Sequence, residues 1–195
     1  MMAMLNIADK IIMTGLGLRV RSFLLFIGFQ TLITFVIIAL LDPYTSIPSE
    51  LWIRGVAVGV MWGIGSPVIL WSLSREEVSR ITPISQSHPM LAVIFAVIFL
   101  GETLSVLESI AAVLAIGGVF LAALNFSGTG GRITISRTVG ILLVAVAIVA
   151  VAQTLLKTVT DDLSFWQALG LRSAGMAIVL IPMNFRRDIA SELIR

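Results

Sequence analysis

The stretch "SRITPISQSHPMLAVIFAVIFLGETLS" (residues 79–105) places a polar, proline-containing cluster directly before an apolar block. Pro83 and Pro89 each remove a backbone N–H donor and loosen the preceding helical turn. In lipid, the freed carbonyls need partners from hydroxyl groups, neighbouring helices or water. Gln86 and His88, the only histidine of the chain, stand in the same cluster. The pattern predicts a proline-broken membrane helix whose polar side lines a water-filled cavity.

The whole chain is too apolar for a water-soluble domain. Of its 195 residues 58% are hydrophobic and only 12% are charged, and the mean hydropathy is +1.06. Soluble domains carry about 25% charged residues. We therefore expect an all-α, polytopic bundle of about six transmembrane helices in the cell membrane. The lack of cysteine excludes disulfides, thiolate metal sites and cysteine nucleophiles, and the scattered basic residues predict no nucleic-acid partner.

Six segments are long and apolar enough to span a bilayer, for which about 20 residues are needed. They are residues 20–41, 53–73, 82–100, 106–124, 138–156 and 165–183. Counting Lys and Arg by alternate loops gives ten on one side and two on the other, and the positive-inside rule makes the first side cytoplasmic. Five acidic residues then fall on the outer side: Asp42, Glu50, Glu102, Asp161 and Asp162.

The second segment carries glycines at a spacing that suits close helix packing. Gly55, Gly59 and Gly63, which we call the glycine seam, form two overlapping GxxxG spacings between Trp52 and Trp71. Glycines at this spacing let two helix backbones approach closely in lipid. We interpret the seam as a packing surface rather than a substrate surface.

The tetrapeptide "LGLR" occurs twice, at residues 16–19 and 169–172, each time at the start of an apolar helix and after a lysine. An odd number of loops separates the copies, so the two helices run in opposite directions. This arrangement indicates an inverted-topology repeat, which is common in secondary transporters.

The stretch "RITPISQSHPMLAVIFAVIFLGETLSVLESIAAVLAIGGVFLAAL" (residues 80–124) resembles the drug/metabolite transporter superfamily, specifically its EamA-type branch. The resemblance rests on the proline-interrupted helix, on the hairpin of Gly101, Glu102, Leu104 and Ser105, and on the small-residue helix that ends in "GGVFL". "GILLVAVAIVAVAQTLLK" (residues 140–157) similarly looks like the first helix of the family's second repeat.

The resemblance implies ten helices in two inverted repeats of five. Residues 1–124 would form a first repeat that lacks most of its first helix, residues 125–137 a Gly/Ser/Thr-rich linker, and residues 138–195 the first two helices of the second repeat. The chain is therefore expected to be part of a longer one. We expect that it cannot complete a transport cycle as a lone monomer, and that the glycine seam faces a helix that is absent.

The candidate substrate-binding residues are Ser85, Gln86, His88, Trp62, Gln153 and Arg172. Pro83, Pro89, Gly101, Glu102 and the glycine seam are assigned structural roles. We expect Glu102 to lie on one cavity wall with solvent-accessible Ser85 and His88. An interhelical hydrogen bond that fixes packing is the alternative for His88, and space filling is the alternative for Trp62.

Several of these positions have a second interpretation. Glu102 is expected to cap the next helix by interacting with its dipole rather than to touch substrate, and Glu108 suits either role. Lys157 and Arg172 either serve the site or extend toward the lipid headgroups. Since residues 138–156 contain no acidic residue, proton-coupled export of cationic drugs is disfavoured, and His88 with Arg172 suits a carboxylate- or phosphate-bearing metabolite.

The leading functional hypothesis is secondary transport of a small polar organic solute by alternating access between two inverted repeats. The alternative is a structural or assembly subunit that pairs with a second copy or a complementary chain in the lipid bilayer. No metalloprotease or serine-hydrolase motif and no phosphate-binding loop is present. We therefore expect no enzyme activity, catalytic residue, metal or cofactor, and no ATP hydrolysis by this chain.

Overall fold

The computed structural model describes residues 20–44, 47–123 and 136–185, and all regular structure in these ranges is helical. The first "LGLR" copy, Lys10 and nearly all of the linker lie outside the described residues. The helices, in chain order, are α2 (Val20–Leu41), α3 (Ser49–Arg75), α4 (Val78–Ser85), α5 (His88–Leu100), α6 (Val106–Ala123), α7 (Arg137–Thr160) and α8 (Phe165–Asn184).

Five stretches are long and apolar enough to cross a membrane: Val20–Leu41, Ser49–Arg75, Val78–Leu100, Arg137–Thr160 and Phe165–Asn184. The third consists of α4 and α5, which meet at a break over residues 86–87. The fourth predicted segment, residues 106–124, corresponds to α6, whose apolar part is shorter. The chain is an integral, multi-pass membrane protein with the predicted helical-bundle architecture.

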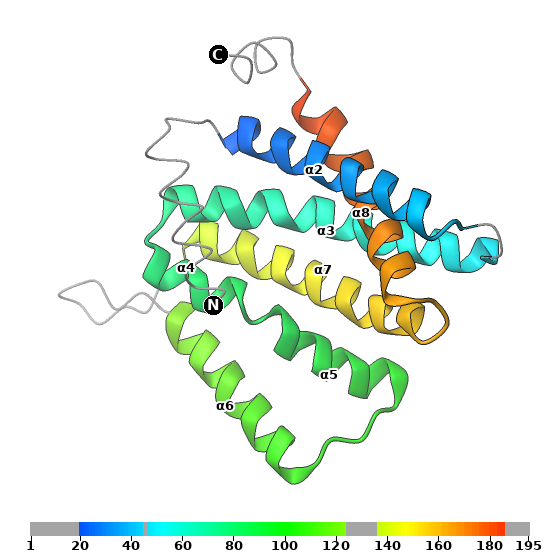
Figure 1. Ribbon diagram of the computed structural model, residues 1–195. Helices are drawn as coiled ribbons and strands as arrows, with labels where there is room; N and C mark the ends of the chain where they lie inside the picture. The colour runs from blue at the N-terminus through cyan, green and yellow to red at the C-terminus, as the bar shows by residue number, and fades with distance from the viewer. Residues whose placement is uncertain (1–19, 45–46, 124–135, 186–195) are drawn as a thin grey trace.

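The helices are arranged around α3 and α7, which lie side by side (Figure 1). Helix α8 crosses α2 and α3 on one side of this pair, and α5 packs against α7 on the other. Helix α6 lies at the edge and contacts mainly α4. Buried apolar side chains from α2, α3, α4, α7 and α8 form one core, which includes Leu24, Leu73, Ile84, Val146 and Leu180.

The glycine seam is a packing surface, as predicted, but its partner is present. A Cβ at Gly55 would lie 2.7 Å from the Cβ of Leu171, and one at Gly63 would lie 2.9 Å from the Cβ of Val179. At Gly59 a Cβ would meet the carbonyl of Arg172 and lie 2.7 Å from the Cα of Gly175. The expectation that the seam faces an absent helix is therefore wrong, because α8 covers it.

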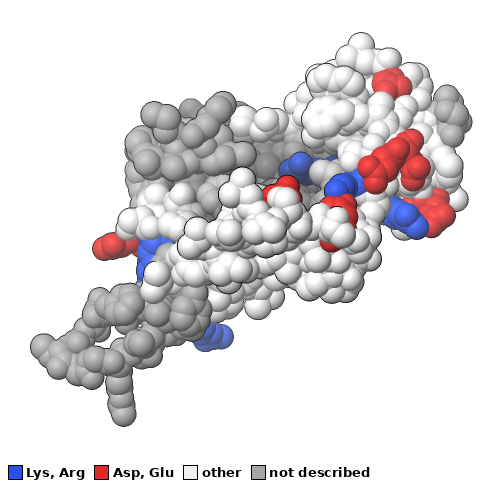
Figure 2. Space-filling model, turned by 90° about the horizontal axis from the view of Figure 1, so that it is seen from below, with Lys and Arg blue, Asp and Glu red and all other residues white. Residues whose placement is uncertain are grey.

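Two of the predicted outer-side loops, α2–α3 and α7–α8, lie together at one end of the bundle, on the right in Figure 1, and the α5–α6 loop runs from that side to the start of α6 at the bottom. Figure 2 shows acidic atoms gathered toward this end of the molecule, while most of the face seen from below is uncharged.

Burial and the nearby Asp42 carboxylate raise the pKa of the Tyr44 phenol, so that it stays neutral. Tyr44 stacks on Phe35 and meets the edge of Trp52.

Two serines join sequence-distant segments at opposite ends of the bundle. Ser136 caps α7 by accepting from the Val139 amide and donates to Glu76 at 2.9 Å. Ser164 caps α8 by accepting from the Gln167 amide and donates to Asp42 at 3.1 Å. Each hydroxyl thus satisfies a free N–H at the start of a helix. It also binds a carboxylate, Glu76 or Asp42, from the part of the chain expected to form the first repeat (residues 1–124).

Replacing Gly59 by alanine is expected to destabilise the protein by about 1–3 kcal/mol, because the added methyl group forces α3 away from α8. The matched control is Gly118→Ala on α6, where a Cβ meets nothing within 4 Å and the higher helix propensity of alanine favours folding. The measurement is the thermal unfolding midpoint in detergent micelles. Equal midpoints for the two variants would contradict the close α3–α8 contact.

Candidate functional site

The predicted break in the third span occurs where Pro89 removes a helical hydrogen bond. An N–H at residue 89 would donate to the carbonyl of Ser85, four residues earlier. In its place, the Nδ1 of His88 lies 2.7 Å from that carbonyl oxygen. Because a carbonyl only accepts, Nδ1 carries the hydrogen in this contact. His88 therefore replaces the donor that proline lacks.

The serine hydroxyls of the cluster also bind the backbone of the break. Ser85 Oγ donates to the Thr82 carbonyl at 3.1 Å, and Ser87 Oγ donates to the Ile84 carbonyl at 2.7 Å. Ser85 is only 2% exposed, so the expectation of a solvent-accessible Ser85 is wrong. Its hydroxyl stabilises the break, and the half-buried Gln86 is the remaining predicted polar side chain of this turn.

Three predicted site residues come together near the middle of the bundle. Trp62 lies at the centre of α3, His88 near the middle of the span Val78–Leu100, and Arg172 about 10 Å from the start of α8. The His88 ring meets the Trp62 ring edge to face at 5.5 Å, and the Arg172 guanidinium carbon lies 4.3 Å from the centre of the Trp62 ring. We call these three residues the interior cluster.

Two polar atoms on the same face of α3 have no hydrogen-bond partner. The Trp62 Nε1 and the Ser66 Oγ are both buried and unpaired among the described residues. Residues four apart lie on the same side of a helix, about 5–6 Å apart. The sequence analysis does not single out Ser66, although its spacing of four residues from Trp62 is a usable indication. A buried donor without a partner is costly, so this face is suited to receive a polar ligand.

The Arg172 guanidinium is not neutralised by an acidic side chain of the described residues. It is half-buried, and its resolved side-chain contact is the cation–π interaction with Trp62. An arginine at this depth is expensive unless it is paired or serves a pathway. The alternative of an arginine that extends to the headgroups does not fit this position over a mid-span tryptophan.

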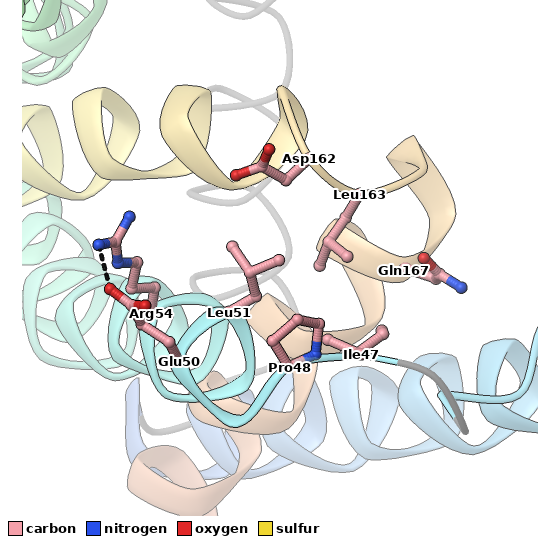
Figure 3. Close-up of a pocket in the computed structure, with 8 residues that line it drawn as sticks. All are labelled: Ile47, Pro48, Glu50, Leu51, Arg54, Asp162, Leu163 and Gln167. Atoms are coloured by element: carbon pink, nitrogen blue, oxygen red, sulfur yellow. Dashed lines mark hydrogen bonds and ion pairs between the residues drawn. The ribbon is translucent and has the colours of Figure 1, made fainter.

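A hollow lies at the end of the bundle where α3 begins and α7 ends, with a volume of about 530 Å³ (Figure 3). Glu50 and Arg54 form an ion pair on its α3 side, and Asp162 lies opposite, on the turn after α7. The amide of Gln167 turns away from the hollow and donates to Asp42 at 3.0 Å. Arg54 lies about two helical turns from Trp62, so this hollow is separate from the interior cluster.

Comparison with known proteins gives one result for the chain. The EamA-like transporter family matches residues 2–124, which is more than half of the sequence. The chain belongs to the EamA-like transporter family. The prediction of an EamA-type member of the drug/metabolite transporter superfamily is therefore confirmed. No curated protein and no solved structure gives a significant match.

Two further predicted residues of this EamA-like chain, Gln153 and Glu102, have other neighbours. Gln153 lines a surface groove beside Lys157 and Phe165. Glu102 lies beyond the far end of α5 and pairs with Lys157, so it shares no cavity wall with His88. The α6 cap comes from Ser105 and Glu108, and the expectation that Glu102 is the cap is wrong.

Gly101 lies where α5 ends and the hairpin to α6 begins. It ends α5 with φ 69° and ψ 22°, in the left-handed region, which glycine adopts without steric cost. Pro83 lies inside α4 and Pro89 in the first turn of α5. Among the described residues of this EamA-like chain, no group of three or more His, Cys, Asp or Glu side chains is placed to hold a metal ion.

A double-mutant cycle tests the role of His88 in the break. His88→Ala is expected to cost about 1–3 kcal/mol, since the Ser85 carbonyl loses its donor. In a Pro89→Ala background the new backbone N–H replaces that donor, so the cost should fall by about 1 kcal/mol or more. Thermal unfolding of the four proteins measures the difference. Strictly additive effects would show that Nδ1 does not replace the missing N–H.

Proposed function

We propose that this EamA-like chain carries a small polar organic metabolite across the membrane by alternating access, without hydrolysing ATP. The observation that supports this most directly is the interior cluster. It places an unneutralised arginine and an unpaired indole N–H at mid-span, in a setting where uncompensated polar groups are costly. A solute that enters this position would supply the missing partners.

The site also lies between the two parts of the chain that the inverted-repeat hypothesis separates. Trp62 and His88 come from α3 and α5, and Arg172 comes from α8. In inverted-repeat carriers the solute site lies at such an interface, and the two repeats move against each other. In this proposal the polar contacts at the two ends break in turn: Ser136 with Glu76 at one end, and Glu102 with Lys157 at the other.

The alternative, a subunit that assembles with a second copy or a complementary chain, is favoured by one observation. Helix α6 has little cover from the described residues, and Val106, Leu107 and Leu114 are each at least 70% exposed. We infer that the transport pathway needs walls in addition to the described helices. Size-exclusion chromatography with light scattering separates the two cases, since activity confined to the dimer supports assembly and activity of a proven monomer excludes it.

Uptake into proteoliposomes tests the site, with a panel of anionic, neutral and cationic small metabolites. Arg172→Gln is expected to reduce saturable uptake at least about tenfold, since one lost charge-assisted contact is worth about 1.4 kcal/mol or more. Trp62→Phe, which keeps the ring but removes the N–H, should give a smaller loss. The control is Arg75→Gln, an exposed arginine at the end of α3.

Two outcomes would contradict this proposal. Uptake that is unchanged in Arg172→Gln would place the solute elsewhere. The absence of saturable uptake of every member of the panel, by both the purified chain and its dimer, would remove the transport function. Thermal unfolding of each variant shows whether a loss comes from misfolding instead of the site.

A further inference from the structure

The interior cluster offers hydrogen-bond donors and positive charge without acidic groups. The Trp62 indole and the Arg172 guanidinium only donate, and the Trp62 Nε1 has no partner. Every Asp and Glu of the described residues lies in a connecting segment or in the first turn of a helix. These residues are Asp42, Glu50, Glu76, Glu77, Glu102, Glu108, Asp161 and Asp162. The described mid-span region therefore offers no carboxylate to a cationic ligand group.

The single positive charge of Arg172 at this depth matches a ligand that carries one negative charge. Arg172 is the permanently charged group of the cluster, and a carboxylate matches the two-pronged donor edge of a guanidinium. A phosphate monoester carries close to two negative charges at neutral pH, which would leave excess charge away from water. An amino acid would bring an ammonium group that finds no carboxylate among the described residues around the cluster.

The contact with Trp62 also prepares Arg172 for such a ligand. A guanidinium that rests 4.3 Å from the centre of an indole ring is held by the cation–π attraction. Less side-chain freedom is then lost when a carboxylate binds. The Trp62 Nε1 and the Ser66 hydroxyl, on the same face of α3, remain as unpaired groups for a second polar atom of the ligand.

We propose that the interior cluster selects organic monocarboxylate anions, with Arg172 binding the carboxylate and Trp62 Nε1 donating to the same ligand. This inference rests on the proposed transport function and names its substrate class. A phosphate ester and the headgroup of an anionic lipid are also anions that a guanidinium binds. The experiment below distinguishes these two ligands from a soluble carboxylate.

The test is ligand binding by the full chain in lipid nanodiscs, measured by thermal stabilisation and by tryptophan fluorescence. One set of probes is phenylacetate, phenylacetamide, phenethylamine, phenylalanine and phenyl phosphate, which differ mainly in the polar group. Butyrate, butyramide and butylamine repeat the comparison on a smaller skeleton. In at least one set, the carboxylate is expected to bind about tenfold or more tightly than its amide and its amine, a difference of about 1.4 kcal/mol.

Variants assign the binding to the cluster. Arg172→Gln should weaken carboxylate binding about tenfold or more, and Arg172→Lys, which keeps the charge but loses the planar fork, should fall in between. Trp62→Phe should weaken binding and remove the fluorescence response. The control is Arg75→Gln, at the end of α3, which should bind like the unmodified chain. Nanodiscs with and without phosphatidylglycerol should give the same affinity.

Several results would overturn the inference. These are no carboxylate binding up to about 10 mM, equal or tighter binding of the amine, the amino acid or the phosphate ester, and carboxylate binding that is unchanged in Arg172→Gln. Competition by phosphatidylglycerol would assign the site to lipid headgroups instead. Uptake of a neutral or cationic solute that depends on Arg172 would keep the transport function and reject the substrate class. Carboxylate binding without uptake would keep the anion site and reject transport.

Discussion

The close contact between α3 and α8 determines the geometry of everything around it. Gly59 and Gly175 approach so closely that a Cβ on either would strike the other helix, and the group opposite Gly59 is the carbonyl of Arg172 itself. The same contact that brings the two backbones together therefore places the Arg172 side chain over Trp62, less than one turn further along α3. In lipid, where apolar side chains gain little from leaving the solvent, such backbone proximity is a main source of helix association. Packing and site are thus two consequences of one contact.

In the third span, His88 both stabilises the helix break and belongs to the interior cluster. Pro89 leaves the Ser85 carbonyl without its helical donor, and the His88 Nδ1 takes its place. That hydrogen bond fixes the imidazole against Trp62, so the proline break orients a member of the interior cluster. The serines of the same turn bind backbone carbonyls. Their hydroxyls are used by the fold, which separates them from the residues available to a solute.

Sequence reasoning located the helices, the proline break and the glycine seam because each depends on local chemistry: apolar length, a missing N–H and a missing side chain. It also singled out Trp62, His88 and Arg172. It could not foresee that α8 covers the glycine seam, because the sequence of one helix does not specify which distant helix packs against it. It misplaced Glu102, whose ion pair with Lys157 joins segments far apart in sequence. It also missed Ser66, whose importance depends on having no partner.

The central claim is that α3–α8 packing holds one half-buried cation over one indole at mid-span. Solid-state NMR of the chain in lipid bilayers measures this directly, with ¹³Cζ-labelled arginine and ¹⁵N-labelled tryptophan. We expect a dipolar contact between an arginine Cζ and an indole Nε1 at a separation of about 4–5 Å, the range of a cation–π pair. This contact should disappear in Arg172→Gln and in Trp62→Phe, while the weaker one from Arg75 and Trp71 remains. A spectrum that is the same in all three proteins would contradict the account.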